Sequence, residues 1–154
     1  MTTERSGDGK IDTWAFMDGP RLQRIELDRD ADDLPDRVEY YDAPASPDTA
    51  APFGGAIISR AEEFGGPDRA VVRREFFEGG VLRRVEEDVD ADGRVDKWEE
   101  HTEGRLTRVD LDVQKRGVAD RRLIYGRGGV ERIELDPDGD GVFELAPVQP
   151  EARP

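Results

Sequence analysis

The chain has 154 residues, of which 39% are charged and only 35% hydrophobic, so it supplies little apolar core for its length. This balance is typical of a repeat sheet, in which each unit buries one face against its neighbours. A net charge of −14 disfavours nucleic acid and anionic membranes as partners and favours divalent cations. The absence of cysteine excludes disulfides and thiolate metal sites, and no apolar run is long enough to insert into a membrane.

An acidic loop recurs along the chain at regular spacing. Steps of 24, 32, 28, 24 and 24 residues separate its copies, so the repeating unit has about 24 residues. We therefore predict a single β-repeat domain over residues 1–146 and a frayed C-terminal tail over residues 147–154. The copies of the loop start at Glu4, Asp28, Arg60, Asp88, Asp112 and Asp136.

Between the loops, each interval predicts a β-hairpin. A glycine turn stands near its middle, at residues 18–19, 103–104 and 126–129, with five to seven residues on either side. That length suits strands, although helical flanks, as in true EF-hands, are the alternative. The predicted fold is all-β, with tandem antiparallel hairpins forming a meander sheet. Because its apolar face must be covered, we expect the sheet to curl or close on itself.

The second arm of each hairpin alternates in character. Ile25 and Leu27 point to one face while Arg24 and Glu26 point to the other, and later units repeat the pattern. Only three of the 23 basic residues are lysine. Because arginine pairs with carboxylates in a forked geometry, the polar face is predicted to carry cross-strand ion pairs.

An insertion over residues 42–59 interrupts the repeat. Its first half is rich in proline, alanine and serine, which indicates a loop, whereas Phe53, Ile57 and Ile58 bring apolar content near its end. We expect the insertion to end in one more strand of the sheet. The alternative is a protruding loop that binds a protein partner. Residues 70–77 are predicted to form the next strand.

The loop over residues 88–99 has the ligand pattern of an EF-hand calcium loop, with carboxylates at positions one, three, five, nine and twelve and glycine at position six. Calcium takes six to eight oxygen ligands, which such a loop can wrap around the ion. The alternative is a solvated acidic turn that binds nothing specifically. The predicted ligands are the side chains of Asp88, Asp90, Asp92, Asp96 and Glu99 and the backbone carbonyl of Arg94.

Two further loops are predicted to bind calcium with weaker patterns. The 28–39 loop lacks glycine at position six, and Pro35 has no N–H to offer. The 136–144 loop has Pro147 at position twelve, and we expect the glutamate at position nine to compensate in part. The predicted ligands are Asp28, Asp30, Asp32, Asp36 and Glu39 in the first of these loops and Asp136, Asp138, Asp140 and Glu144 in the second.

The remaining loops are poorer candidates. The loop that starts at Glu4 has Ala15 at position twelve. The 112–120 loop is predicted to hold no metal, because Arg116 replaces an aspartate ligand and would serve as an internal counter-ion. The degenerate unit over residues 60–68 is also expected to hold none.

Three other side chains are weighed as candidates for function. Trp14 and Trp98 share one repeat position and are expected to pack on the hairpins, with ligand stacking as the alternative. His101, the single histidine, is expected to be solvated, and no serine or cysteine nucleophile pattern surrounds it. A hydrolase that uses paired acids is disfavoured, because the repeat accounts for the acids.

The Asp-x-Asp-x-Asp-Gly loops resemble the calcium loops of EF-hands, dockerins and thrombospondin type 3 repeats. The hairpins, with tryptophan followed by Gly-x-Leu-x-Arg, resemble short tandem repeats of bacterial surface and lipoprotein-type sequences. The resemblance implies a non-enzymatic calcium-binding structural or interaction protein. Its setting would be extracytoplasmic, although the N-terminal residues show no signal peptide. The alternative function is a calcium-independent β scaffold that binds a protein partner through residues 42–59 or an exposed sheet face.

Overall fold

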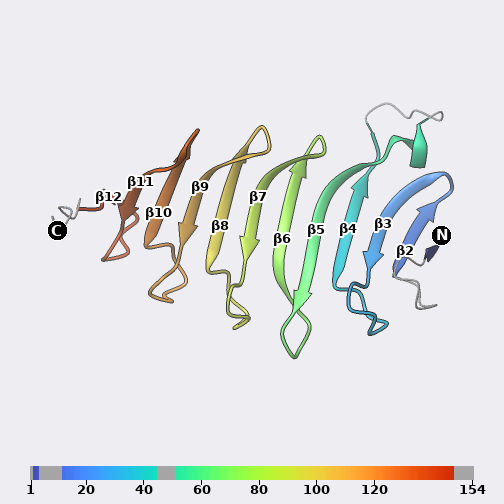
Figure 1. Cartoon of the computed structure of the whole chain (residues 1–154), viewed down its shortest axis with the longest axis horizontal. Helices are drawn as coiled ribbons and strands as arrows, with labels where there is room; N and C mark the ends of the chain where they lie inside the picture. Colours follow the sequence, from blue (N-terminus) through green and yellow to red (C-terminus); the bar gives the residue numbers. More distant parts are fainter. Residues whose placement is uncertain (1, 4–11, 45–50, 148–154) are drawn as a thin grey trace.

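The computed structural model describes residues 2–3, 12–44 and 51–147. In this part of the chain, twelve strands form one sheet in which every strand pairs antiparallel with its neighbours in sequence (Figure 1). The predicted all-β antiparallel meander is therefore confirmed. The strands are β1 (Thr2–Thr3), β2 (Thr13–Asp18), β3 (Arg21–Leu27), β4 (Arg37–Asp42), β5 (Ile57–Gly65), β6 (Ala70–Glu78), β7 (Val81–Glu87), β8 (Lys97–Thr102), β9 (Arg105–Leu111), β10 (Arg121–Gly126), β11 (Gly129–Leu135) and β12 (Glu144–Leu145).

The insertion ends in a strand, as predicted. The short 3₁₀ element η1 (Pro52–Gly55) contacts β3, and β5 begins shortly afterwards at Ile57. Residues 45–50 of the insertion, residues 4–11 of the first predicted loop and residues 148–154 of the predicted tail lie outside the described residues. Within the described part of the chain, no helix has the length and apolar character needed to cross a membrane.

The two ends of the strands carry mostly different kinds of connection, although the short turn at residues 66–69 between β5 and β6 lies at the same end as the acidic loops (Figure 1). Short hairpin turns, such as residues 79–80 and 103–104, lie at one end, which we call the turn end. The acidic loops lie at the opposite end, which we call the loop end. The loop at residues 88–96 joins β7 directly to β8, and Glu99 lies inside β8. Both flanks of this loop are strands, so the helical alternative is wrong.

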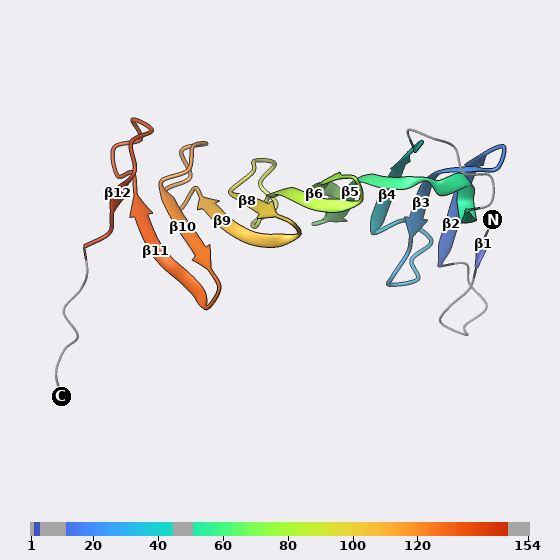
Figure 2. The same ribbon diagram turned by 90° about the horizontal axis from the view of Figure 1, so that it is seen from above.

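The sheet is a single open layer, and the prediction that it closes on itself is wrong (Figure 2). It twists along its length, and β1 and β12 lie at its two edges. Among the described residues, only five apolar side chains are buried, whereas eight acidic side chains are buried. Hydrogen bonds and ion pairs therefore replace much of the usual apolar core. The buried apolar residues are Leu22, Val38, Ala61, Val85 and Val109.

One face of the sheet is charged in its middle, which explains why it does not need to be covered. The residues in register with Leu27 and Leu111 on the intervening strands alternate between basic and acidic. Their side chains form ion pairs across neighbouring strands, for example Arg73 with Glu87 at 3.2 Å. Charged groups that are paired in this way satisfy one another without a second layer. In order across the sheet, this row is Leu27, Arg37, Glu63, Arg73, Glu87, Lys97 and Leu111.

The opposite face carries arginines stacked on aromatic rings. Arg24 lies 3.8 Å from the ring centre of Phe16, and Arg84 lies 4.4 Å from that of Phe76. The predicted arginine–carboxylate pairs form on this face, but several of them, such as Arg24 with Glu26 at 2.8 Å, lie within one strand and not across strands. Cation–π contacts at exposed sites contribute about 0.5–1 kcal/mol each.

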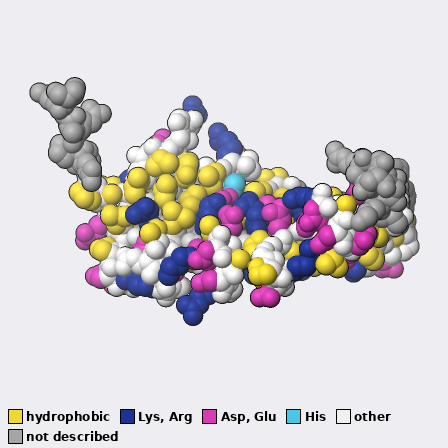
Figure 3. All heavy atoms as spheres, turned by 60° about the horizontal axis from the view of Figure 1, so that its bottom comes forward, with side chains coloured by type: hydrophobic (Ala, Val, Ile, Leu, Met, Phe, Trp, Pro, Cys, Tyr) yellow, Lys and Arg dark blue, Asp and Glu magenta, His cyan; other side chains and the backbone are white. Residues whose placement is uncertain are grey.

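On the face of the sheet that carries the charged row, apolar side chains gather toward the C-terminal strands (Figure 3). Val109, Leu123 and Ile133 are register neighbours on β9, β10 and β11. Ile133 is 42% exposed and Val130 is 47% exposed. We call these residues, with Leu111 and Leu135, the C-terminal apolar patch.

Candidate metal sites

Backbone hydrogen bonds hold the acidic loops in fixed register. The N–H of Asp96, at position nine, donates to the carbonyl of Glu87 at 2.9 Å and so closes the 88–96 loop. The N–H of Asp112, at position one of the next loop, donates to the carbonyl of Asp96 at 2.8 Å. Asp136 pairs with Asp120 in the same way at 2.9 Å, so successive loops are tied to one another at the loop end.

The aspartate at position one organises each loop. Its carboxylate accepts the backbone N–H of the residue at position six in all four described loops, a local side-chain-to-backbone hydrogen bond of the kind that aspartate makes in turns. A second N–H, at position four or five, donates to the other carboxylate oxygen. The position-six contacts are Asp33 to Asp28 at 2.9 Å, Gly93 to Asp88 at 2.8 Å, Gly117 to Asp112 at 2.5 Å and Gly141 to Asp136 at 2.9 Å.

The aspartate at position nine has a second structural role. Asp36, Asp96 and Asp120 each accept the backbone N–H of the residue at position two, at 2.6 Å, 3.2 Å and 3.3 Å. The carboxylates at positions one and nine are mostly buried, and the 112–120 loop keeps both of them although Arg116 replaces an acid there. The same hydrogen bonds therefore frame the loops that carry the acidic pattern and the 112–120 loop, which lacks it.

Three loops bring carboxylates together. In each of them, one oxygen from each of three aspartates lies within 4.8 Å of the other two. Such a set offers only hard oxygen ligands, which are the kind that calcium and magnesium take. We call these sets the carboxylate clusters, and they are Asp28, Asp30 and Asp32; Asp88, Asp90 and Asp96; and Asp136, Asp138 and Asp140.

Several predicted ligands lie outside the clusters. Asp92 is exposed and accepts the N–H of Arg94 at 2.9 Å, so in this structure it shapes the loop. Asp36 accepts the N–H of Arg29 and is not part of the 28–32 cluster. Glu144 is exposed on β12. Arg94 is exposed in its loop, where its backbone carbonyl remains a predicted ligand.

The two predicted glutamate ligands at position twelve lie on a sheet face, away from the clusters. Glu99 contacts Lys97 at 2.7 Å and His101 at 3.0 Å, and Glu39 contacts Arg37 at 2.9 Å. Burial alone would raise the pKa of Glu99, but the hydrogen bonds from Lys97 and His101 outweigh it and lower this pKa. The expectation that His101 is solvated is wrong, since its side chain is only 10% exposed.

No protein-family model matches the chain, and a search of curated proteins finds no match. The loops and their carboxylate clusters therefore carry the functional argument by themselves.

Basic side chains from neighbouring segments reach into the loops, and the sequence pattern does not reveal them. The Lys115 ammonium lies 2.7 Å from Asp90 and 2.9 Å from Asp96. Arg69, in the turn that follows β5, lies 3.0 Å from Asp32 and donates to the carbonyl of Pro35 at 2.7 Å. This turn stands where the degenerate 60–68 unit was expected to form a loop, because residues 60–65 belong to β5.

Arg116 does not act as the predicted counter-ion of its own loop. Its guanidinium reaches forward and donates to the backbone carbonyls of Asp136 at 3.1 Å and Pro137 at 3.3 Å. Lys115, the residue before it, takes the counter-ion role for the preceding loop instead. A lysine beside acidic loops, in a chain with only three lysines, is the one sequence signal that could have found this.

The pKa values of two cluster members are shifted in opposite directions. Burial and the negative charges of Asp32 and Asp36 raise the pKa of Asp30. The hydrogen bond from Lys115 lowers the pKa of Asp90. Repulsion among the carboxylates of the first cluster is thus only partly relieved, and a bound cation would relieve it further.

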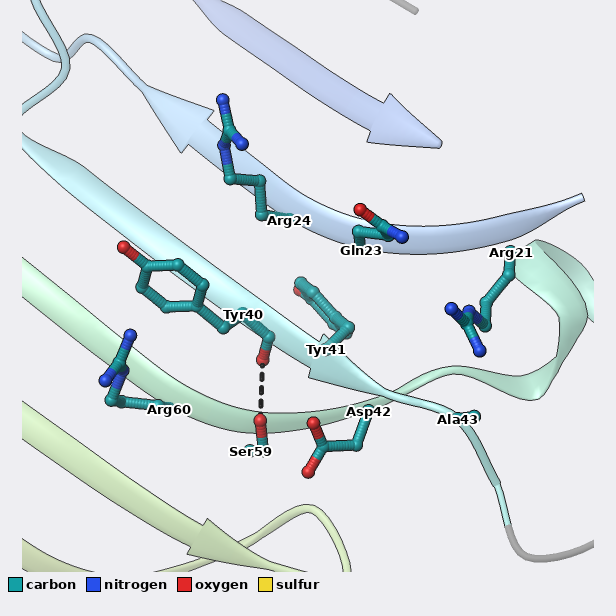
Figure 4. A pocket seen from close by; sticks show the side chains of 9 residues that line it. All are labelled: Arg21, Gln23, Arg24, Tyr40, Tyr41, Asp42, Ala43, Ser59 and Arg60. Atoms are coloured by element: carbon teal, nitrogen blue, oxygen red, sulfur yellow. Dashed lines mark hydrogen bonds between the residues drawn. The ribbon is translucent and has the colours of Figure 1, made fainter. Parts of the chain in front are cut away.

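Apart from the carboxylate clusters, the described residues form a groove at the turn end (Figure 4). It is lined by β3, β4 and β5, and Ser59 donates to the carbonyl of Tyr40 at 3.4 Å across it. Its arginines have partners nearby, since Arg21 lies 3.3 Å from Asp18 and Arg60 stacks 4.3 Å from the ring centre of Tyr40. The groove therefore offers little unmatched charge to an anionic ligand.

Proposed function

We propose that this protein is a non-enzymatic structural or interaction module whose acidic loops bind divalent cations, calcium first. The observation that carries the proposal is the recurrence of three carboxylate clusters at the loop end of one sheet, each with three aspartate oxygens within 4.8 Å of one another. Calcium–oxygen distances are about 2.3–2.6 Å, so two ligands on opposite sides of one ion lie roughly 4.6–5.2 Å apart. The aspartate oxygens within each cluster are therefore close enough to one another to bind the same calcium ion.

The ligand set supports weak binding. An EF-hand loop adds a bidentate glutamate at position twelve, whereas Glu39 and Glu99 are paired on the sheet face. Three carboxylates with backbone carbonyls and water fit the affinity of extracellular modules, with dissociation constants of roughly 10⁻⁴–10⁻³ M. Such sites fill where calcium is millimolar, which supports the extracytoplasmic setting that the resemblance to surface-repeat sequences suggests.

Calcium binding would stabilise the folded sheet without changing its conformation. The hydrogen bonds at positions one and nine already set the loop frame, so the ion would neutralise repulsion in a loop that is largely formed. A ligand that binds only the folded state stabilises it by mass action, by about 1.4 kcal/mol per site at ten times the dissociation constant. The high net negative charge of −14 makes this neutralisation favourable.

Isothermal titration calorimetry with calcium chloride tests the proposal. We expect saturable binding by the wild type in the submillimolar to millimolar range. The Asp138→Asn/Asp140→Asn variant loses two carboxylates of one cluster and should bind fewer ions. Asp18→Asn/Asp68→Asn removes the same charge from two exposed aspartates outside the clusters and should bind as the wild type does. Absence of saturable binding, or an equal loss in the control, would refute the proposal.

A calcium-independent β scaffold for a protein partner is the second candidate. The exposure of the C-terminal apolar patch, with Val130 at 47% and Ile133 at 42%, favours it, as does Phe53 of the insertion at 48%. Exposed apolar patches often mark interaction surfaces. A melting temperature that is indifferent to calcium and to EDTA would favour this candidate over calcium binding.

A further inference from the structure

The 88–96 loop, which has the best calcium pattern in the sequence, already holds a cation supplied by the chain. Lys115 is the fourth residue of the following loop, and its Nζ lies 2.7 Å from Asp90 Oδ2 and 2.9 Å from Asp96 Oδ1. Both aspartates belong to one carboxylate cluster, together with Asp88. The ammonium thus occupies oxygens that a divalent cation would need.

We propose that Lys115 is an intramolecular competitor for the metal, so that the 88–96 loop binds calcium only when Lys115 withdraws. The 136–140 cluster would then be the tighter site of the two. This inference rests on the proposed function, since it concerns what regulates the same loops.

The competition follows from the chemistry of the two cations. Lysine has three N–H donors and no acceptor, and its ammonium gives charge-assisted hydrogen bonds to carboxylates. Calcium coordinates the same lone pairs at about 2.3–2.6 Å, which leaves no room for an ammonium between the oxygens. Calcium must therefore break both contacts of Lys115 before it can use Asp90 and Asp96 together.

The 136–140 cluster provides the contrast. Arg116 reaches it from the same loop that carries Lys115, but donates only to the carbonyls of Asp136 and Pro137. Among the described residues, no basic side chain lies within 4.0 Å of a carboxylate oxygen of this cluster. The oxygens of Asp136 accept backbone N–H groups from Gly139 and Gly141 at 2.8 Å and 2.9 Å. A cation can approach without displacing another.

The 28–32 cluster is intermediate. Arg69 lies 3.0 Å from Asp32, but its other contact within 3.5 Å is the carbonyl of Pro35, and Asp36 is 3.7 Å away. Asp28 and Asp30 are outside these contacts. The order of calcium affinity predicted from the structure therefore differs from the order that the loop sequences alone suggest.

Amide resonances resolve the two sites in one titration. Gly93 and Gly141 occupy position six of their loops and donate to the first aspartate of each, so their ¹H–¹⁵N signals should respond to calcium at the nearest cluster. In the wild type, we expect Gly141 to move at lower calcium than Gly93. In Lys115→Met, the calcium midpoint of Gly93 should fall about tenfold while that of Gly141 stays within about twofold.

Two matched variants control for charge and for fold. Arg127→Met removes one positive charge from an exposed turn at the turn end and should leave both midpoints within about twofold of the wild type. Lys115→Arg keeps a cation at the site and should keep the Gly93 midpoint well above that of Lys115→Met. An unchanged Gly93 midpoint in Lys115→Met, with Gly141 still responding, would overturn this inference alone. No response of either glycine in any variant would overturn the proposed function as well.

Discussion

Arg37 on β4 donates a hydrogen bond to Glu75 on β6 at 2.8 Å, across the intervening strand β5. Ala61 of β5, whose side chain is fully buried, is in register with Glu75 on β6 and with Glu39 on β4. The same guanidinium contacts Glu39 at 2.9 Å and Glu63 at 3.0 Å. One arginine thus joins three strands in a sheet that has no second layer, and both it and Glu75 are largely covered, at 11% and 14% exposure.

Replacing Arg37 by methionine should destabilise the protein by about 2–3 kcal/mol, because three part-buried carboxylates lose their common partner. Urea unfolding at pH 7, followed by circular dichroism, measures this change. Arg83→Met removes an equally charged side chain from an exposed pair with Glu78, with exposures of 46% and 75%. The Arg83→Met variant should lower the free energy of unfolding by at most about 0.5 kcal/mol. Equal costs for the two variants would show that the Arg37 network contributes nothing special.

The same network should make the protein less stable as the pH is lowered in the acid range. Burial would raise the pKa of Glu75, but hydrogen bonds from Arg37 and Arg73 outweigh it and hold this pKa below its ordinary value of 4.5. A lowered folded-state pKa contributes stability that is present above about pH 4.5 and is lost as the pH falls through the folded-state pKa. The stability difference between the wild type and Glu75→Gln should therefore shrink between pH 7 and pH 3 in urea unfolding. A difference that stays constant over this range would contradict the assignment.

The aspartate at position one should matter for folding even in a loop that lacks the calcium pattern. Asp112 is 4% exposed and accepts the N–H groups of Arg116 and Gly117. Asp112→Ala leaves both donors unpaired and should cost about 2 kcal/mol, equally in EDTA and in calcium. Asp140→Asn changes an exposed member of a carboxylate cluster and should lower the melting temperature only when calcium is present. A calcium-dependent cost for Asp112→Ala would show that the 112–120 loop also takes part in metal binding.

The hairpins and their order were predictable from the sequence because their signals are local. Glycine turns and the alternation of Ile25 and Leu27 with charged neighbours specify each hairpin within about a dozen residues. Closure was predicted wrongly because the apolar residues of three hairpins, Leu27 and Leu111 among them, were taken to represent the whole face of the sheet. Arg37 and Lys97 occupy the same row on other strands, and their register becomes visible only when all the strands are paired.

For the candidate metal sites, the sequence predicted which carboxylates lie together mainly at the first positions of each loop. The spacing of alternate aspartates places them together in the loop, as it does at Asp136 and Asp138. Glu99 lies elsewhere because the residues after Asp96 enter a strand, which directs the glutamate onto a sheet face, whereas a helix would have returned it to the loop. The contact of Lys115 with Asp90 crosses 25 positions of sequence between two different loops, so no pattern within one loop could predict it.

The most direct test of calcium binding by the loops is the melting temperature of the wild type in EDTA, in 10 mM calcium chloride and in potassium chloride of equal ionic strength. At about ten times the dissociation constant, each occupied site adds about 1.4 kcal/mol, which raises the melting temperature of a chain of this size by roughly 3–6 °C. We predict a rise of about 5 °C or more in calcium beyond that in potassium chloride. An equal rise in the two salts would mean that calcium only screens the negative charge, and would contradict binding at the clusters.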